Sequence, residues 1–366
     1  MIAAMPPYRP AAARPGWISF SDWRPDLGEF PFPLWRKILA RRIRTSGHAL
    51  FDYSNMGTGH EELRAEIAAY AARSRAVRCT AGQVIVVNGS QQALDLCARL
   101  LIDRGDQVAL EDPGYQGARR IFGAYGARLH PIAVGAGGVD PAKLGRRARL
   151  LYVTPSHQFP TGVSLSVTRR LELIEWARRH GAAIIEDDYD SEYRYSGPPL
   201  PAMQGLAGGA PVIYVGTFSK VMFPGLRIGY VIAPRSLVGA FARAKWLADR
   251  QTPMLEQAAL ADFLREGHLE RHIRRMRRLY GRRREVLMEA LRRHFGDHAE
   301  VRGEAAGMHA TVRFEDPAIA ARAVAGRVHL ATSGPYYMGR APANEFIIGF
   351  SAIGERAIRE AVRRLA

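Results

Sequence analysis

Seven short apolar runs, separated by segments with helical spacing, occupy most of the first two thirds of the chain. The runs are Val84–Val87, Gln107–Glu111, Leu129–Val134, Leu150–Thr154, Ala183–Asp187, Val212–Gly216 and Ile228–Ala233. Such alternation is typical of an α/β fold with a large, doubly wound, mostly parallel sheet. Because ligands of these sheets bind beyond the carboxyl ends of the strands, functional residues are expected where the runs end.

The chain is long enough for a second domain, since its 366 residues, 47% of them hydrophobic, exceed what one core needs. Apolar runs at Ala310–Phe314 and Phe346–Phe350, followed by a closing helix at Glu355–Leu365, predict a smaller α+β domain. After Pro234 we expect a long helical region to about Phe295. Four parts are predicted: a flexible arm or linker remnant at 1–16, an N-terminal segment packing with the small domain at 17–48, a large domain at 49–245, and a long helix with the small C-terminal domain at 246–366.

Composition argues against several classes of protein. The stretch Ile2–Met5 is too short for the apolar region of a secretory signal, and Pro6 follows at once. No apolar run approaches the length of a membrane span, so we expect a cytoplasmic protein with no membrane partner. Cys79 and Cys97 are the only cysteines and form no CxxC pair, which argues against a disulfide scaffold and a zinc site; no metal is predicted.

Basic residues are mostly arginine, because only Lys37, Lys143, Lys220 and Lys245 are lysines among 52 basic side chains. The formal net charge of +17 is compatible with binding to nucleic acid or to an anionic cofactor. It is equally compatible with a protein that has no specific anionic partner. The densest basic stretch, Arg274–Arg284, has helical spacing, which favours a solvated helix face over contact with DNA. The scarcity of lysine makes each one worth examining.

A candidate phosphate site follows the first apolar run. The loop after Val84–Val87 contains Gly89, Ser90 and Gln91 and leads into a predicted helix at Ala93–Leu101. Small residues at a helix start leave backbone N–H groups free, and together with the helix dipole these suit a phosphate. An ordinary helix cap is the alternative interpretation.

Acidic residues and a tyrosine follow the run Ala183–Asp187, where an apolar strand leaves the core. A carboxylate there would hold a cationic ring nitrogen. The alternative is a solvated loop in which acidic side chains make local turn hydrogen bonds.

A lysine follows the run Val212–Gly216. Thr217 and Ser219 precede Lys220, whose neighbours are otherwise apolar, and a lysine in a partly desolvated pocket loses its proton more readily and attacks carbonyl groups. The two hydroxyls would form a second half of a phosphate site with the guanidinium of Arg227. A surface lysine and a salt-bridged arginine are the alternatives.

Taken in this order, the segments resemble fold-type I pyridoxal 5′-phosphate (PLP)-dependent transferases of the aminotransferase class I/II superfamily, from about residue 17 to the end. More narrowly, the chain resembles the aminotransferase-like domain of MocR-type regulators of the GntR family. The segments that carry this resemblance are Ile18–Phe20, Pro31–Trp35, Glu111–Tyr115, Thr154–Gly162, Glu186–Tyr193 and Ser333–Tyr337.

The resemblance implies that PLP is held as a Schiff base on Lys220, which would act as a base once a substrate amine displaces it. Asp187 would pair with the pyridinium nitrogen, Tyr189 would hydrogen-bond the phenolic oxygen, and Tyr115 would stack on the ring. A homodimer is also implied, in which Tyr53 reaches the partner's phosphate; a core tyrosine is the alternative.

Two positions depart from the family pattern. Phe159 stands where aminotransferases place an asparagine that contacts the phenolic oxygen, so His157 or Gln158 is the predicted substitute. Ile347 stands where they place the arginine that binds the substrate carboxylate. Without that arginine, ordinary amino acids should bind and orient poorly.

Two functions therefore remain open. The first is a PLP-dependent aminotransferase acting on a small amine or amino acid. The second is an effector-sensing domain, derived from a MocR-type regulator, that binds PLP and an amine without completing transamination. About sixteen residues stand where such regulators carry a winged-helix domain, so we do not expect this chain to bind DNA.

Overall fold

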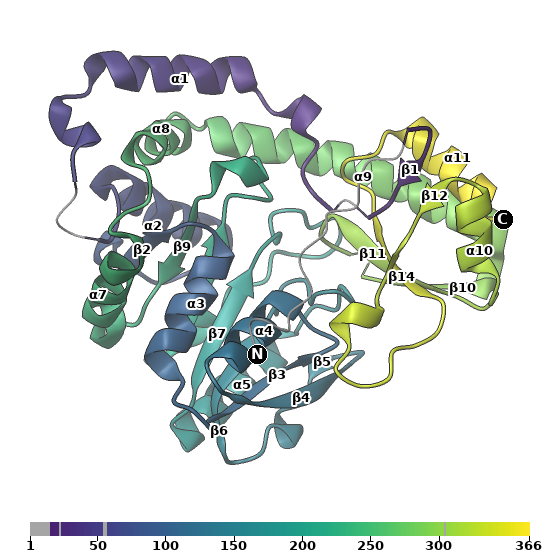
Figure 1. Cartoon of the computed structure of the whole chain (residues 1–366), viewed down its shortest axis with the longest axis horizontal. Helices are drawn as coiled ribbons and strands as arrows, with labels where there is room; N and C mark the ends of the chain where they lie inside the picture. Colours follow the sequence, from purple (N-terminus) through teal and green to yellow (C-terminus); the bar gives the residue numbers. More distant parts are fainter. Residues whose placement is uncertain (1–14, 22, 54–56, 304) are drawn as a thin grey trace.

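A computed structural model of the protein describes residues 15–21, 23–53, 57–303 and 305–366. It contains a large α/β part and a smaller α+β part, with the long helix α9 (His268–Phe295) leading from one to the other (Figure 1). The predicted fold class is confirmed. The arm predicted at 1–16 falls almost wholly outside the described residues.

The large sheet has eight strands. In order across the sheet they are β2 (Val84–Val87), β9 (Gly229–Ile232), β8 (Val212–Thr217), β7 (Ala183–Asp188), β6 (Ala148–Val153), β3 (Gln107–Asp112), β4 (Arg128–Gly135) and β5 (Gly138–Val139). The five strands from β8 to β4 run parallel. Strand β9 is antiparallel to both of its neighbours, and β5 is antiparallel to β4. The prediction of a mostly parallel sheet is therefore confirmed, with exceptions at both edges.

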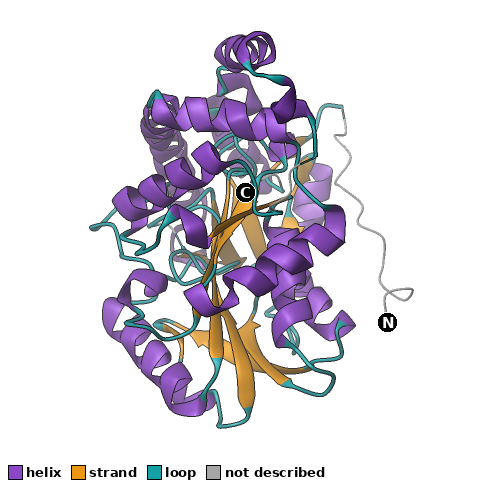
Figure 2. Cartoon of the chain, turned by 90° about the vertical axis from the view of Figure 1, so that its left-hand side faces the viewer, coloured by secondary structure: helices purple, strands orange, loops and turns teal. Residues whose placement is uncertain are grey.

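Helices cover both faces of this sheet (Figure 2). They are α2 (Glu61–Arg75), α3 (Ser90–Leu101), α4 (Gln116–Ala124), α5 (Val167–His180), α6 (Met203–Leu206), α7 (Val238–Asp249) and α8 (Met254–Arg265). Alternate residues of strand β2 pack in different hydrophobic cores. Ile85 and Val87 lie in one core with α3, α4 and α7, whereas Val84 and Val86 lie in another with α2 and α8. Both faces of β2 are thus buried, which explains why its sequence is a continuous apolar run.

The smaller part is built on an antiparallel sheet of four strands. In order they are β10 (Ala299–Arg302), β11 (His309–Phe314), β14 (Glu345–Gly349) and β13 (Ala331–Thr332). Its helices α10 (Ile319–Ala325) and α11 (Glu355–Leu365) lie beside α9 (Figure 1). Near the N-terminus, β1 (Ile18–Ser19) pairs in parallel with β12 (Val328–His329), and α1 (Phe32–Thr45) packs against α8.

The long helical region expected after Pro234 is present and is divided into three helices, α7, α8 and α9. Pro253 stands at the start of α8, where its missing N–H and fixed φ favour the first turn of a new helix. Gly267 separates α8 from α9 with a φ of 69°, a left-handed conformation that glycine adopts without strain. None of the helices in the described part of the chain has the length and apolar character that crossing a bilayer requires.

Candidate active site

A cavity of about 1100 Å³ opens where the parallel strands end. Nine of the predicted site residues line it: Ser90, Gln91, Tyr115, Asp187, Tyr189, Thr217, Ser219, Lys220 and Arg227. Trp23 and Tyr336 close it from the side of the smaller part. Residues far apart in the sequence therefore meet at one position because the strands that carry them end at one edge of the sheet.

One end of the cavity presents N–H donors and a cation. Gly89 is the N-cap of α3 with a φ of 82°, and Arg227, itself at a φ of 52°, donates from Nη2 to the carbonyl of Asn88 at 2.8 Å. A Cβ at Gly89 would lie 2.9 Å from that same nitrogen, so glycine leaves the room the guanidinium occupies. A helix N-terminus beside an arginine is a suitable site for a phosphate.

Lys220 lies just beyond β8 and lines the cavity. Its Nζ donates to the backbone carbonyl of Trp23 at 2.9 Å. Burial lowers the pKa of Lys220, while the charge of Asp190 acts in the opposite direction. The lowered pKa favours the neutral amine, which is the form that attacks a carbonyl group.

Asp187 is the last residue but one of β7 and is 5% exposed. Its Oδ2 accepts a hydrogen bond from the Tyr152 hydroxyl at 2.8 Å, whereas its Oδ1 is buried and has no partner among the described residues. Burial raises the pKa of Asp187 to about 7. A cationic N–H donor would pair with Oδ1 and stabilise the carboxylate, so this position fits the pyridinium nitrogen of PLP.

Aromatic side chains form the walls of the cavity. Phe159 lies in edge-to-face contact with Tyr115, with ring centroids 6.1 Å apart, and with Tyr336, at 4.9 Å. The hydroxyl of Tyr189 donates to the backbone carbonyl of His157 at 2.9 Å. These rings line the same cavity as the Asp187 carboxylate, and their apolar faces suit contact with a planar ring.

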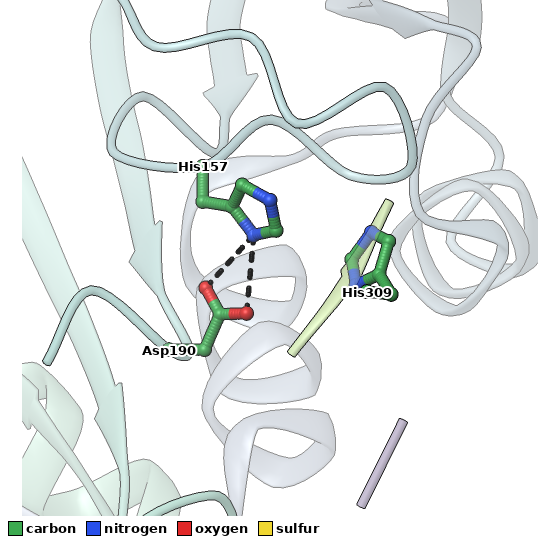
Figure 3. A group of neighbouring side chains, drawn as sticks. All are labelled: His157, Asp190 and His309. Carbon is green, nitrogen blue, oxygen red and sulfur yellow. Dashed lines mark hydrogen bonds and ion pairs between the residues drawn. The ribbon is translucent and has the colours of Figure 1, made fainter. Parts of the chain in front are cut away.

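Three residues considered in the sequence analysis, His157, Gln158 and Tyr53, lie outside the cavity lining. The prediction that His157 contacts the cofactor is not supported, because its ring lies outside the cavity lining and its Nδ1 is 3.1 Å from both carboxylate oxygens of Asp190 (Figure 3). Gln158 is also buried and bonds Glu111, Thr161 and backbone carbonyls. Tyr53 is 71% exposed, so it is not a core tyrosine; contact with a partner's phosphate stays a prediction.

Several lining residues were missed by the sequence analysis. Trp23, Gln116, Arg120 and Tyr336 all border the cavity. Tyr336 stands in a segment that carried the family resemblance, which was the available signal, whereas nothing near Trp23 marks its backbone carbonyl as a partner of Lys220. Ile347, in place of the arginine of aminotransferases, is fully buried.

The raised pKa of Asp187 predicts a pH dependence of the cofactor-free protein. The folded-state pKa of Asp187 lies near 7, above the ordinary value of 3.8. Between these pH values the folded protein therefore binds more protons than the unfolded chain does. As a result, the free energy of unfolding should fall as pH rises through this window. Glu111 and Glu192, whose pKa values burial also raises to about 7, contribute in the same direction.

Asp187→Asn should therefore stabilise the cofactor-free protein at pH 8 by about 2–4 kcal/mol relative to the original chain, with little difference near pH 4. Denaturant unfolding at a series of pH values checks this, with the exposed Asp103→Asn as a control that should leave the curve unchanged. If the free energy of unfolding varied with pH in the same way for Asp187→Asn and the original chain, the raised pKa of Asp187 would be contradicted.

The comparisons with known proteins agree with this fold and with a site at this edge of the sheet. The family "Aminotransferase class I and II" matches residues 22–365, and the chain belongs to this family. It is similar to the probable rhizopine catabolism regulatory protein MocR of Rhizobium meliloti, with 41% identity over 96% of this chain and 72% of that protein. It is also similar to 2-aminoadipate transaminase of Thermus thermophilus, with 32% identity over 96% of this chain and 90% of that protein.

Solved structures with a similar fold include aminotransferases. The α-aminoadipate aminotransferase of Thermus thermophilus, complexed with N-(5′-phosphopyridoxyl)-L-leucine, superposes with a TM-score of 0.86 at 30% identity, covering 96% of this chain and 91% of that chain. The kynurenine aminotransferase of Pyrococcus horikoshii superposes with a TM-score of 0.87 at 28% identity, covering 96% and 90%. The chain is thus similar both to regulators and to enzymes.

Proposed function

We propose that this protein binds PLP covalently through Lys220 and reacts with the amino group of a small amine or amino acid, as in transamination. One observation carries the proposal: a buried amine of lowered pKa, an unpaired buried carboxylate oxygen and an arginine at a helix N-terminus border the same cavity. These are the three groups that a PLP carbonyl, ring nitrogen and phosphate require.

Each end of the cofactor has matching residues. The backbone N–H groups at the start of α3, with the side chains of Ser219 and Arg227, would bind the phosphate. Asp187 would hold the ring nitrogen, Tyr115 would lie against the ring, and Tyr189 would face the phenolic oxygen. When bound, PLP would act as the electron sink for a carbanion at the substrate α-carbon.

The substrate's own carboxylate has no obvious partner in the smaller part. Ile347 lies at the predicted position with 0% exposure, in the centre of β14. Two arginines line the cavity, Arg120 from α4 and Arg227. Since Arg227 is assigned to the phosphate, Arg120 remains available for a substrate carboxylate. The substrate is therefore proposed to be either an amine without an α-carboxylate or an acid held by Arg120.

A second candidate function is an effector-sensing domain that binds PLP and an amine without completing transamination. Two observations favour it: the 41% identity to a MocR regulator and the apolar Ile347 in place of the carboxylate-binding arginine. Without bidentate binding of the substrate, the bond to be broken is poorly oriented for proton transfer to Lys220.

The two functions predict different results with a panel of amines. If the protein is an enzyme, an amino donor should convert all bound cofactor to the pyridoxamine form and release one equivalent of keto product. If it is a sensor, the donor should shift the visible absorbance band to a new position that persists, without keto product. Absorbance and product analysis on the same samples separate these outcomes, and no spectral response to any amine would contradict both.

A homodimer is also proposed. Phe51, Tyr53, Trp246 and Leu247 are exposed by 42% or more, and Arg250 lies over the rings of Tyr53 and Trp246, so these apolar side chains gather on one surface. Exposed apolar groups of this size are typical of a subunit interface. A small-molecule partner and a cytoplasmic location complete the proposal.

A further inference from the structure

A charged pair lies at the end of α7, next to the loop that leads into α3. Lys245 and Asp249 are one turn apart on α7, and the Lys245 ammonium donates a hydrogen bond to Oδ1 of Asp249. The Lys245 side chain is 0% exposed and the Asp249 side chain 24%. The proposed cofactor contacts use neither residue.

The second carboxylate oxygen of Asp249 binds the loop before α3. Oδ2 accepts hydrogen bonds from Nδ2 of Asn88 at 2.6 Å and from Nε2 of Gln92 at 2.8 Å. Oε1 of Gln92 in turn accepts from the backbone N–H of Asn88 at 2.9 Å. One carboxylate therefore connects two amide side chains that stand on either side of Gly89 and Ser90.

These contacts bear directly on the end of the cavity assigned to the phosphate. Between Asn88 and Gln92 the chain carries Ser90 and Gln91, which line the cavity, and the backbone N–H groups of a first helical turn have no partner within the helix. The Asn88 carbonyl accepts the hydrogen bond from Nη2 of Arg227. Asn88 is thus in contact with both Asp249 and the phosphate-binding arginine.

The position of Asp249 is unfavourable for the helix that carries it. A carboxylate in the last turn of a helix lies at the negative end of the helix dipole. The next residue, Arg250, has a φ of 61° and a ψ of −61°, and the N–H of Gln251 donates to the Asp249 carbonyl at 2.7 Å. This is a γ-turn of the rare, strained kind, which persists only where surrounding contacts determine it. The contacts of the Asp249 side chain with the α3 loop are of this kind.

Lys245 has an electrostatic role in this arrangement. A carboxylate without a counter-charge behind the loop would repel a bound phosphate. The Lys245 ammonium neutralises Asp249, so the loop gains a strong hydrogen-bond acceptor without a net negative charge. Burial lowers the pKa of Lys245, whereas the hydrogen bond and the charge of Asp249 act in the opposite direction.

We propose that Asp249 is a positioning residue for the phosphate of the cofactor, acting through Asn88 and Gln92, and that Lys245 neutralises its charge. This rests on the proposed function, in which the first turn of α3 and Arg227 bind the phosphate. The effect of Asp249 should therefore be confined to the phosphate and should not extend to the aldehyde that reacts with Lys220.

The test compares PLP with pyridoxal, which has the same ring and aldehyde but no phosphate. Cofactor-free protein is titrated with each compound while the visible absorbance is followed, and the ratio of the two dissociation constants measures the contribution of the phosphate. Asp249→Ala should lower the preference for PLP by about tenfold or more, because two amides lose their shared acceptor. The pyridoxal dissociation constant should change by less than about twofold, whereas general destabilisation would weaken both compounds.

Two further variants approach the same contacts from other sides. Gln92→Met should also lower the preference for PLP, and combining it with Asp249→Ala should cost less than the sum of the two. Lys245→Met with Asp249→Asn removes both charges but keeps an oxygen that faces the two amides, so the preference should stay within about twofold of the original. Asp103→Asn is the control, since it removes an exposed carboxylate just beyond the opposite end of α3.

An unchanged preference in Asp249→Ala, or equal weakening of PLP and pyridoxal, would overturn the proposal. The original chain separates this outcome from a failure of the proposed function. If it binds pyridoxal as tightly as PLP, the proposed phosphate site is wrong and the role of Asp249 with it. If it prefers PLP and Asp249→Ala keeps that preference, only the role of Asp249 and Lys245 is wrong.

Discussion

Lys220→Ala is expected to leave a folded protein that holds no covalent PLP and transfers amino groups at least about 10³-fold more slowly than the original chain. The reason is that one nitrogen has two functions: it forms the bond to the cofactor and is the nearest base to the substrate carbon. The Lys220 side chain ends in the cavity rather than in a packed core, so its truncation should leave the strands and helices in place.

Absorbance after dialysis against PLP-free buffer measures the lost bond, and keto-product formation measures the rate. Lys143→Ala is the control, since Lys143 is exposed and remote from the sheet edge that carries the cavity. Retention of the visible band by Lys220→Ala, or transfer within tenfold of the original rate, would show that another residue carries the cofactor.

Arg75→Met is expected to lower the free energy of unfolding by about 3–5 kcal/mol, because it leaves a buried carboxylate without its cation. Arg75, at the end of α2, donates from Nε to Oδ2 of Asp188 at 2.6 Å and from Nη1 to the Leu200 carbonyl at 2.6 Å. The two charged side chains are 6% and 1% exposed. Burial alone would raise the pKa of Asp188, but Arg75 and hydrogen bonds from Ser191 and Tyr214 hold it below its ordinary value.

Denaturant unfolding checks this value against Arg178→Met, which breaks an exposed ion pair with Glu175 and should cost less than about 1 kcal/mol. Adding Asp188→Asn to Arg75→Met should recover part of the loss, because the unpaired charge is removed. Since Asp188 is next to Asp187, a weaker affinity for PLP should accompany the lower stability. Equal costs for Arg75→Met and Arg178→Met would contradict this account.

The strand ends were the most predictable part of the site. The residues Ala183–Ile185 and Val212–Val215 are apolar because both faces of β7 and β8 are buried. The polar segments that follow them contain the residues that reach the cavity, Asp187 and Lys220. The direction of β9 was not predictable, because a continuous apolar run has the same pattern whether the strand is parallel or antiparallel.

Contacts between distant segments were the least predictable part. His157 was expected at the cofactor on the basis of its position in one motif, but its ring turns toward Asp190 and His309, which belong to other elements. The Trp23 carbonyl that meets Lys220 is a backbone group, so no residue type marks it. The Arg75 partnership with Asp188 joins a helix end to a strand end and leaves no spacing signal.

The central claim is that the Lys220 nitrogen forms the covalent bond to PLP. Borohydride reduction of PLP-loaded protein, followed by proteolysis and mass spectrometry, tests it most directly. This account predicts one pyridoxyl group per chain, on the peptide that contains Lys220. A pyridoxyl group on Lys37, Lys143 or Lys245, or no stable addition to any lysine, would contradict it.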